Sequence, residues 1–280
     1  MNAIASARSF LFVPASRPER YAKALASGAG AVIIDLEDAV APDTKVQARQ
    51  QLVDGFSALQ AADRLRVLVR INGAGTTWYA DDLALMDRLS KHDLGGVVLP
   101  KAEAVADLVQ LTAMVGSGCA VLPMIETAAG LAALDLLAAC TGVTRLVFGN
   151  LDFQADLGMA CGPDEAELQP VRLALVVASR RAGLASPVDG VTPGTSDTVQ
   201  LQQDAARSRR SGFGAKLCIH PAQVALVQDT LVPTSAEIDW ARRVLDAKSR
   251  SDGGVFILDG RMVDAPVLRL AQRVFALAAP

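Results

Sequence analysis

The chain has 280 residues and a net charge of −3, and about half of its residues are hydrophobic. This length is ordinary for one α/β barrel, and the hydrophobic fraction is enough to fill a large core. The absence of a basic tract argues against nucleic acid as a partner. No apolar run reaches the length of about 18 residues that a membrane span needs, and the N-terminal apolar run is too short for a signal peptide.

The cysteines and histidines limit the kinds of site that the chain can carry. None of the four cysteines forms a CxxC pair, and the two histidines lie far from them in the sequence. This spacing argues against a zinc site. Scattered, unpaired cysteines in a chain of this size are typical of the reducing cytoplasm, where we expect the protein.

One pattern repeats along the chain: a short apolar run ends in polar, Gly or Pro residues, and a helical segment follows. Such alternation predicts parallel βαβ units. Eight units predict a closed (β/α)₈ barrel, and an open doubly wound sheet is the alternative. The eight apolar runs are SFLFVP (9–14), AVIIDLE (31–37), RVLVRIN (66–72), GGVVLPK (95–101), CAVLPMIE (119–126), RLVFGN (145–150), SPVDGVTP (186–193) and AKLCIH (215–220).

The C-terminal part of the chain exceeds what eight units need. We expect residues 1–248 to form the barrel and residues 249–280 to form a C-terminal lid segment. This lid would pack on the barrel, cap its mouth or reach a neighbouring subunit. Helices are predicted at residues 21–27, 102–115, 130–139, 169–182, 221–232, 235–247 and 265–277, with a loop at 249–254.

Polar residues follow the predicted strands, at the end of a barrel where active sites lie. Strand alternation places Asp35 and Glu37 on one face of the second run, and Arg70 and Asn72 on one face of the third. Because the opposite, apolar face of the third run should meet the helices, Arg70 is expected to point into the barrel near its mouth. A charged strand end can also be a solvated turn or an ion pair that serves packing alone.

The concentration of charge at these strand ends indicates a metal site. Glu37, Asp38, Arg70, Glu126 and Asp152 would converge on one rim of the barrel. Unpaired carboxylates at that density repel one another, and a hard divalent cation relieves the repulsion. Oxygen ligands in a histidine-poor site favour Mg²⁺.

The segment after the first strand carries a possible phosphate site. Ser16 and Glu19 have the spacing of a helix capping box, with Ser16 as the N-cap. Arg17, Arg20 and Lys23 then follow at three-residue spacing on about one helix face. Cations beside a helix N-terminus at the barrel mouth could bind phosphate. A solvated basic face is the alternative interpretation.

Several motifs together resemble one known family, the citrate lyase β-subunit-like proteins of the HpcH/HpaI aldolase superfamily. The resemblance covers nearly the whole chain, in order. It implies a (β/α)₈ barrel that is trimeric or a multiple of trimers, with Mg²⁺ at the strand ends. The motifs are LFVPASRPER (11–20), IDLEDAV (34–40), VRING (69–73), LPKAE (99–103), PMIETAAG (123–130), FGNLDF (148–153), GAKLCIHPAQV (214–224) and GRMVDAPVLRLAQ (260–272).

The resemblance also implies roles for residues at the barrel mouth. Glu126 of PMIET and Asp152 of FGNLD correspond to the metal ligands. Arg70 of VRIN corresponds to the substrate-binding arginine, and Glu37 and Asp38 of LEDAV correspond to the acidic pair next to the metal.

Further correspondences lie outside the strand ends. Phe12, Arg17 and Lys23 fall in the segment that contacts coenzyme A in the family, although this chain has Glu19 where some CoA-binding relatives carry a lysine. Asp264 of MVDAP corresponds to an acid/base residue that the C-terminal lid delivers, often from the adjacent subunit. Taken without the resemblance, Asp264 reads as an exposed helix-capping residue.

The residues and the resemblance agree on retro-Claisen cleavage of a hydroxyacyl thioester, of the citryl-CoA or malyl-CoA type. The products would be acetyl-CoA or a homologue and a 2-oxo acid, and the thioester could be carried by coenzyme A or by an acyl-carrier protein. The alternatives are a class II aldolase for free 2-oxo acids, a malyl-CoA-type thioesterase and a non-catalytic subunit. The basic segment and the lid argue against the free-acid aldolase, and the intact acidic cluster argues against the non-catalytic subunit.

Overall fold

The computed structural model describes residues 3–250 and 254–278, which form two compact units. The first unit spans Met1–Gln228 and the second spans Asp229–Pro280. This division comes earlier than the expected boundary at 248/249. The reason is that α13 (Ser235–Ser249) shares a hydrophobic core with α14 (Ala265–Ala278) and therefore belongs with the C-terminal segment.

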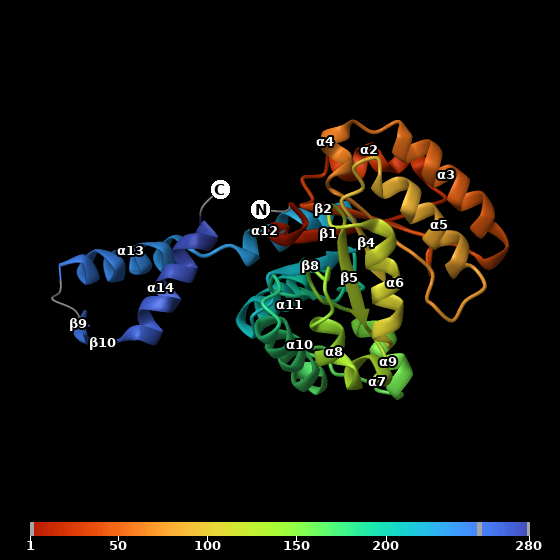
Figure 1. Ribbon diagram of the computed structural model, residues 1–280. Helices are drawn as coiled ribbons and strands as arrows, with labels where there is room; N and C mark the ends of the chain where they lie inside the picture. Colours follow the sequence, from red (N-terminus) through yellow and green to blue (C-terminus); the bar gives the residue numbers. More distant parts are fainter. Residues whose placement is uncertain (1–2, 251–253, 279–280) are drawn as a thin grey trace. The chain divides into compact units, whose positions relative to one another are not determined.

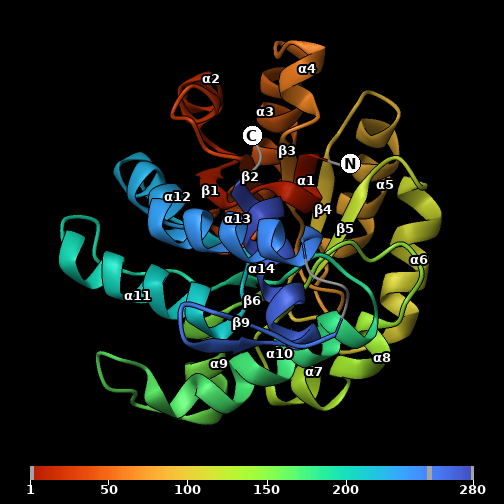
Figure 2. The ribbon, with the colours of Figure 1, turned by 90° about the vertical axis from the view of Figure 1, so that its left-hand side faces the viewer.

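The first unit is a closed barrel of eight parallel strands, which confirms the predicted fold class. Each of the eight predicted apolar runs contains one strand. The helices that alternate with the strands lie around them (Figures 1 and 2). The strands are β1 (Ser9–Pro14), β2 (Ala31–Asp35), β3 (Val67–Arg70), β4 (Gly96–Leu99), β5 (Ala120–Ile125), β6 (Val147–Phe148), β7 (Val188–Asp189) and β8 (Ala215–Cys218).

The helices of this unit connect the strands. The predicted helix at 130–139 is divided into two short ones, α7 and α8. The α-helices are α1 (Ala3–Ser6), α2 (Tyr21–Leu25), α3 (Lys45–Ser57), α4 (Ala61–Arg64), α5 (Tyr79–Ser90), α6 (Val105–Val115), α7 (Ala128–Ala132), α8 (Leu134–Ala138), α9 (Asn150–Leu157), α10 (Gln169–Arg181), α11 (Thr198–Ser211) and α12 (Val224–Leu231). The 3₁₀ helices are η1 (Pro18–Arg20), η2 (Pro42–Thr44), η3 (Ala166–Leu168) and η4 (Pro221–Gln223).

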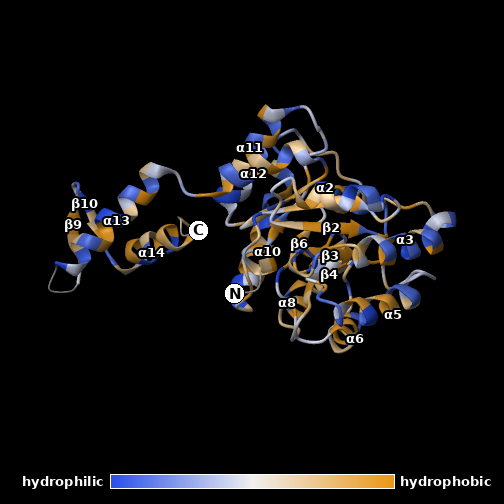
Figure 3. Cartoon of the chain, turned by 90° about the horizontal axis from the view of Figure 1, so that it is seen from above, coloured by the Kyte–Doolittle hydropathy of each residue, from blue (hydrophilic) through white to orange (hydrophobic). Residues whose placement is uncertain are grey.

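The barrel interior is filled by apolar side chains from alternate strand positions. Ile33 of β2 and Leu68 of β3 belong to this buried cluster, as strand alternation predicts. In Figure 3 the barrel strands are coloured as hydrophobic, whereas α3 and α5 carry both hydrophilic and hydrophobic residues. Each strand therefore contributes one or more apolar side chains to the interior, and the residues at the C-terminal ends of the strands form a polar mouth.

The N-terminal end of the barrel is closed by apolar packing and by hydrogen bonds from one buried arginine. Ile4 of α1 lies in the interior cluster. The buried guanidinium of Arg145 donates hydrogen bonds to the carbonyls of Ile4, at 3.2 Å, and Ala7, at 2.7 Å. A third bond runs to the Ser186 carbonyl at 2.8 Å. These contacts fix α1 across the barrel end that carries no site residue.

The second unit is a helical pair with a small hairpin. Strand β9 (Phe256–Leu258) pairs antiparallel with β10 (Arg261–Val263), and α14 follows. In this unit Val263 is buried and Val267 packs on the same core, whereas Leu270 is 54% exposed. Within the part of the chain that the structure describes, no helix is both long and apolar enough to span a bilayer.

Candidate active site

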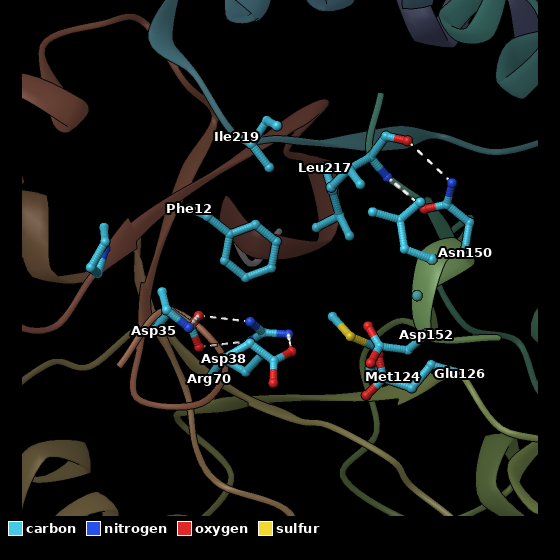
Figure 4. Close-up of a pocket in the computed structure, with 15 residues that line it drawn as sticks. Phe12, Asp35, Asp38, Arg70, Met124, Glu126, Asn150, Asp152, Leu217 and Ile219 are labelled. Carbon is cyan, nitrogen blue, oxygen red and sulfur yellow. Dashed lines mark hydrogen bonds and ion pairs between the residues drawn. The ribbon is translucent and has the colours of Figure 1, made fainter. Parts of the chain in front are cut away.

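A cavity of about 390 Å³ opens at the C-terminal ends of the barrel strands. Figure 4 shows Arg70 beneath Phe12 on one side of this cavity, with Glu126 and Asp152 on the other. The cavity is lined by Phe12, Pro14, Asp35, Asp38, Ala39, Arg70, Met124, Glu126, Gly149, Asn150, Leu151, Asp152, Val191, Leu217 and Ile219. The strand ends therefore meet in one polar chamber with an apolar wall.

Arg70 is held by carboxylates from the neighbouring strand. The β2–β3 register sets Asp35 opposite Arg70, and the Asp35 carboxylate accepts two hydrogen bonds of 2.7 Å from Nε and Nη2 of Arg70. The remaining Nη1 lies 2.9 Å from Glu37 and 3.6 Å from Asp38. Asp35 therefore occupies the Nε–Nη2 side of the guanidinium, and the Nη1 end of Arg70 faces Glu37 and Asp38.

Asp35 also shapes the loop that carries the acidic pair. Its two carboxylate oxygens accept the backbone N–H groups of Glu37, at 2.9 Å, and Ala39, at 3.0 Å. The buried ammonium of Lys45 donates to the carbonyls of Leu36 and Glu37 at 2.6 and 2.7 Å. The loop is thus fixed from both sides, with Glu37 buried and Asp38 exposed toward the cavity.

Glu126 and Asp152 come from adjacent βα units. Glu126 directly follows β5 and is 1% exposed, whereas Asp152 lies in the first turn of α9, which follows β6. One Glu126 oxygen, Oε1, accepts the Lys101 backbone N–H at 2.8 Å. The other, Oε2, is buried without a hydrogen-bond partner among the described residues. A buried carboxylate oxygen without a partner lowers the stability of the fold unless a ligand or an ion binds to it.

Gly149 makes room for this carboxylate. A Cβ atom at position 149 would stand 2.2 Å from Glu126 Oε2 and 2.7 Å from Glu126 Cβ. Any side chain there would displace Glu126, so the close approach of β6 to Glu126 requires a glycine.

Lys101 joins the acidic groups. Its ammonium donates to Glu37 Oε1 at 2.6 Å and lies 3.9 Å from Glu126 Oε1 and 3.7 Å from Asp152 Oδ1. Burial lowers the pKa of Lys101, but the hydrogen bond and the charge of Glu37 outweigh it, so the pKa is raised overall. The ammonium is therefore the positive centre of this side of the cavity.

The carboxyl groups are electrostatically strained. Burial, followed by the charges of Glu37 and Asp152, raises the pKa of Glu126 to about 8. Burial also raises the pKa of Glu37, although Arg70 and Lys101 oppose the shift. Burial is the main cause of both shifts, and the nearby negative charges of Glu37 and Asp152 add to the shift of Glu126.

The donor set fits Mg²⁺. Glu126 and Asp152 offer oxygen atoms, and Glu126 Oε2 lacks a hydrogen-bond partner within residues 3–250 and 254–278. In those same residues, no three carboxylate, histidine or cysteine groups gather closely enough to hold a cation alone. Mg²⁺ is commonly bound by one or two carboxylates, with water or substrate completing its six positions.

The residues expected to contact coenzyme A are divided between two places. Phe12 lines the cavity, with its ring centre 4.8 Å from the Arg70 guanidinium carbon. Arg17 and Lys23 are exposed. The capping box predicted for Ser16 and Glu19 is absent, because the chain turns into the 3₁₀ helix η1 with no side-chain cap, and Glu19 faces Arg17 at 3.7 Å instead.

Asp264 lies in the second unit, immediately before α14. Its carboxylate accepts the Val267 N–H at 3.1 Å, so it caps the helix, as the alternative interpretation held. It is partly exposed, and this cap leaves a carboxylate oxygen for other contacts. An acid/base role for Asp264 remains a prediction.

Two residues of the site were not among the candidates drawn from the sequence. Asp35 shared a strand face with Glu37, and that alternation was the signal for its place beside Arg70. Lys101 ends the fourth predicted strand, but its sequence neighbours do not indicate that its side chain crosses to Glu37. The structure brings together Phe12, Glu37, Asp38, Arg70, Glu126 and Asp152 and adds Asp35 and Lys101 to them.

This geometry defines a class: a (β/α)₈ barrel whose mouth presents a carboxylate pair suited to a divalent cation, opposite an arginine. The model of the HpcH/HpaI aldolase/citrate lyase family matches residues 8–221. The chain therefore belongs to the HpcH/HpaI aldolase/citrate lyase family.

Individual relatives extend the match over both units. A citrate lyase subunit beta-like protein of Mycobacterium tuberculosis is 36% identical, over 99% of this chain and 98% of the relative. A (3S)-malyl-CoA thioesterase of Cereibacter sphaeroides is 34% identical, over 97% of this chain and 94% of the relative. The crystal structure of protein CitE from Mycobacterium tuberculosis with magnesium, acetoacetate and coenzyme A has a TM-score of 0.85 and 36% identity, covering 98% of this chain and 99% of that one.

Proposed function

We propose that the chain is a Mg²⁺-dependent carbon–carbon lyase that cleaves a hydroxyacyl thioester into acetyl-CoA, or a homologue, and a 2-oxo acid. The observation that carries this proposal is the Glu126–Asp152 pair, which faces Arg70 across one cavity and has a Glu126 oxygen without a hydrogen-bond partner among the described residues. The magnesium and coenzyme A of the related crystal structure support the cation and the thioester carrier.

Mg²⁺ bound by Glu126 and Asp152 would supply Lewis acidity to the hydroxyl and carboxylate oxygens of the substrate. The chain's own residues do the rest. The Nη1 edge of Arg70 neutralises negative charge on the substrate, and Glu37 holds that edge in place at 2.9 Å. Asp38 lines the cavity with a half-exposed carboxylate and is placed to take the hydroxyl proton.

The bond changes balance without a further reactant. The hydroxyl loses its proton as its carbon becomes the carbonyl of the 2-oxo acid. The bond from that carbon to the thioester α-carbon breaks, and its electron pair forms the thioester enolate. The α-carbon then takes a proton, which we assign to Asp264 of the second unit. This assignment requires the second unit to reach a barrel mouth, of the same or a neighbouring chain, and a homotrimer or hexamer is the assembly that we propose.

The thioester carrier is coenzyme A in this proposal, and Phe12 would pack against the acyl end of the ligand. Arg17 and Lys23 follow β1 at the surface and would meet the phosphates. The four cysteines are free, which supports a reducing cytoplasm as the compartment. An acyl-carrier protein in place of coenzyme A would require a partner surface that these residues do not define.

A panel of citryl-, malyl-, citramalyl- and methylmalyl-CoA tests the proposal. With Mg²⁺, one or more of these should yield a 2-oxo acid, detected as its hydrazone, and EDTA should abolish the product. Turnover of free hydroxy-oxo acids alone would support the class II aldolase instead. Metal binding with no turnover of any substrate would indicate a non-catalytic subunit.

A thioesterase is the second candidate, favoured by the (3S)-malyl-CoA thioesterase among the relatives. Water attacking the thioester carbonyl would release free coenzyme A and the hydroxy acid from the same site. A thiol reagent separates the two activities, because cleavage between carbons leaves the thioester intact and thioester hydrolysis exposes one thiol per turnover.

A further inference from the structure

Lys101 has a backbone conformation that residues other than glycine rarely adopt. Its φ is 46°, in the left-handed region, which costs free energy for a residue with a Cβ. In this conformation the Lys101 backbone N–H reaches Glu126 Oε1 at 2.8 Å. The bond occupies one Glu126 oxygen and leaves Oε2 as the oxygen without a hydrogen-bond partner among the described residues.

The Lys101 side chain gathers carboxylates from three separate segments. Glu37 follows β2, Glu126 follows β5, and Asp152 lies in α9, and each has an oxygen within 4.0 Å of the ammonium. Its shortest contact, at 2.6 Å, is with Glu37. Glu37 is therefore drawn between Lys101 and Arg70, and the ammonium stands beside both proposed metal ligands.

The two cations of the site divide the acidic groups between them. Arg70 lies within 4.0 Å of Asp35, Glu37 and Asp38. Lys101 lies on the opposite side, within 4.0 Å of Glu126 and Asp152, and also contacts Glu37. A divalent cation held by Glu126 and Asp152 would be repelled by the positive charge of this ammonium.

We propose that Lys101 is a positioning residue of the metal site: its ammonium restrains Glu37 against Arg70 and opposes a cation on Glu126 and Asp152. This inference rests on the metal site of the proposed function. It assigns Lys101 two effects of opposite sign. The ammonium weakens binding of the free cation, and it keeps the acidic pair arranged for the reaction.

Titration calorimetry of the full-length chain with MgCl₂, without substrate, tests the inference. Lys101→Met keeps the stem and the backbone but removes the charge, and it should bind Mg²⁺ at least about fivefold more tightly, because the ammonium beside Glu126 and Asp152 no longer repels the cation. Lys101→Arg should stay within about twofold of wild type. The matched control is Lys91→Met, which removes an exposed lysine that pairs with Asp87 at 2.9 Å, and it should bind as wild type does.

Kinetics give the second readout. Lys101→Met should lower kcat by about tenfold or more while less Mg²⁺ is needed for half-maximal rate, because Glu37 is released as the cation is bound more tightly. A purely structural role would weaken Mg²⁺ binding and kcat together. Lys101→Arg should restore most of kcat.

The outcomes separate this inference from the proposed function. A wild-type chain that binds no Mg²⁺ would contradict the metal site itself. A wild type that binds Mg²⁺ with a folded Lys101→Met variant of equal or weaker affinity would overturn the role of Lys101. If circular dichroism shows Lys101→Met unfolded, Lys101→Gln, neutral but able to donate to Glu37, is judged by the same shift in affinity.

Discussion

Asp35 holds two parts of the candidate site in place at the mouth of this barrel. Its carboxylate accepts two bonds from Arg70 and two from the backbone of the acidic loop. A single buried side chain therefore fixes both the arginine and the loop that carries Glu37 and Asp38. Strand alternation could place Asp35 and Arg70 on inward faces, but only the register of β2 with β3 sets them opposite each other.

Arg70→Lys tests whether the planar guanidinium is needed. One ammonium cannot replace two bonds to Asp35 and the contact of Nη1 with Glu37, so kcat/KM for the best acyl-CoA substrate should fall by about 10²-fold or more. Arg181→Lys is the control, since Arg181 forms an exposed pair with Asp135. Steady-state kinetics equal to wild type in Arg70→Lys would mean that Arg70 serves packing alone.

Glu126 predicts a pH dependence of stability in the metal-free protein. Its pKa is about 8 in the fold and near 4.5 as an ordinary glutamate, so the folded state binds one more proton between these values. Stability from this group is fully present below about pH 4.5 and is lost as the pH rises to about 8. In EDTA, the melting temperature of wild type relative to Glu126→Gln should fall by on the order of 5 °C from pH 5 to pH 8.

The glutamine variant is the reference here because it resembles the protonated acid and does not titrate. Groups far from Glu126 contribute equally to both proteins and cancel in the difference. Melting curves that keep a constant separation across this range would show that Glu126 titrates near its ordinary pKa.

At the scale of elements, the junction of β6 with α9 is the most tightly constrained part of the site. Gly149→Ala should weaken Mg²⁺ binding by about tenfold or more, because the new Cβ would stand 2.2 Å from Glu126 Oε2 and push the carboxylate away. Calorimetric titration with MgCl₂ measures the loss. Gly118→Ala is the control, since a Cβ there meets nothing within 4 Å. Equal Mg²⁺ affinity in Gly149→Ala and wild type would exclude Glu126 Oε2 as a metal ligand.

The elements also show what the sequence could and could not predict. All eight strands lie in apolar runs that the sequence marks clearly, even β6 and β7 with two residues each. The predicted cap at Ser16 failed, because local spacing does not reveal that Pro18 begins a 3₁₀ turn. The contact of Lys101 with Glu37 could not be predicted from neighbouring residues, because the two are 64 positions apart and come together only when the barrel closes.

At the scale of the whole molecule, the proposed reaction needs the second unit to supply Asp264. Asp264→Asn should keep Mg²⁺ binding but lose on the order of 10²–10⁴ in rate, the range for a general acid–base group. Mixing Asp264→Asn with Glu126→Ala and allowing subunits to exchange should restore some activity if each site draws on two chains. Assays of each variant alone and of the mixture measure this.

The mixing experiment can have three outcomes. Recovery in the mixture supports a shared site in an oligomer. Loss without recovery places Asp264 over the barrel of its own chain. Full activity of Asp264→Asn alone would leave Asp264 as the cap of α14, bonded to Val267, and would assign the proton to another group.

The central claim is that a carbon–carbon bond breaks to give an enolate, which is then protonated at its α-carbon. Turnover in ²H₂O with Mg²⁺, followed by mass spectrometry of the products, tests this claim most directly. With malyl-CoA, for example, we predict a 2-oxo acid together with acetyl-CoA that carries one deuterium in its methyl group. Release of the intact hydroxy acid with free coenzyme A would contradict it.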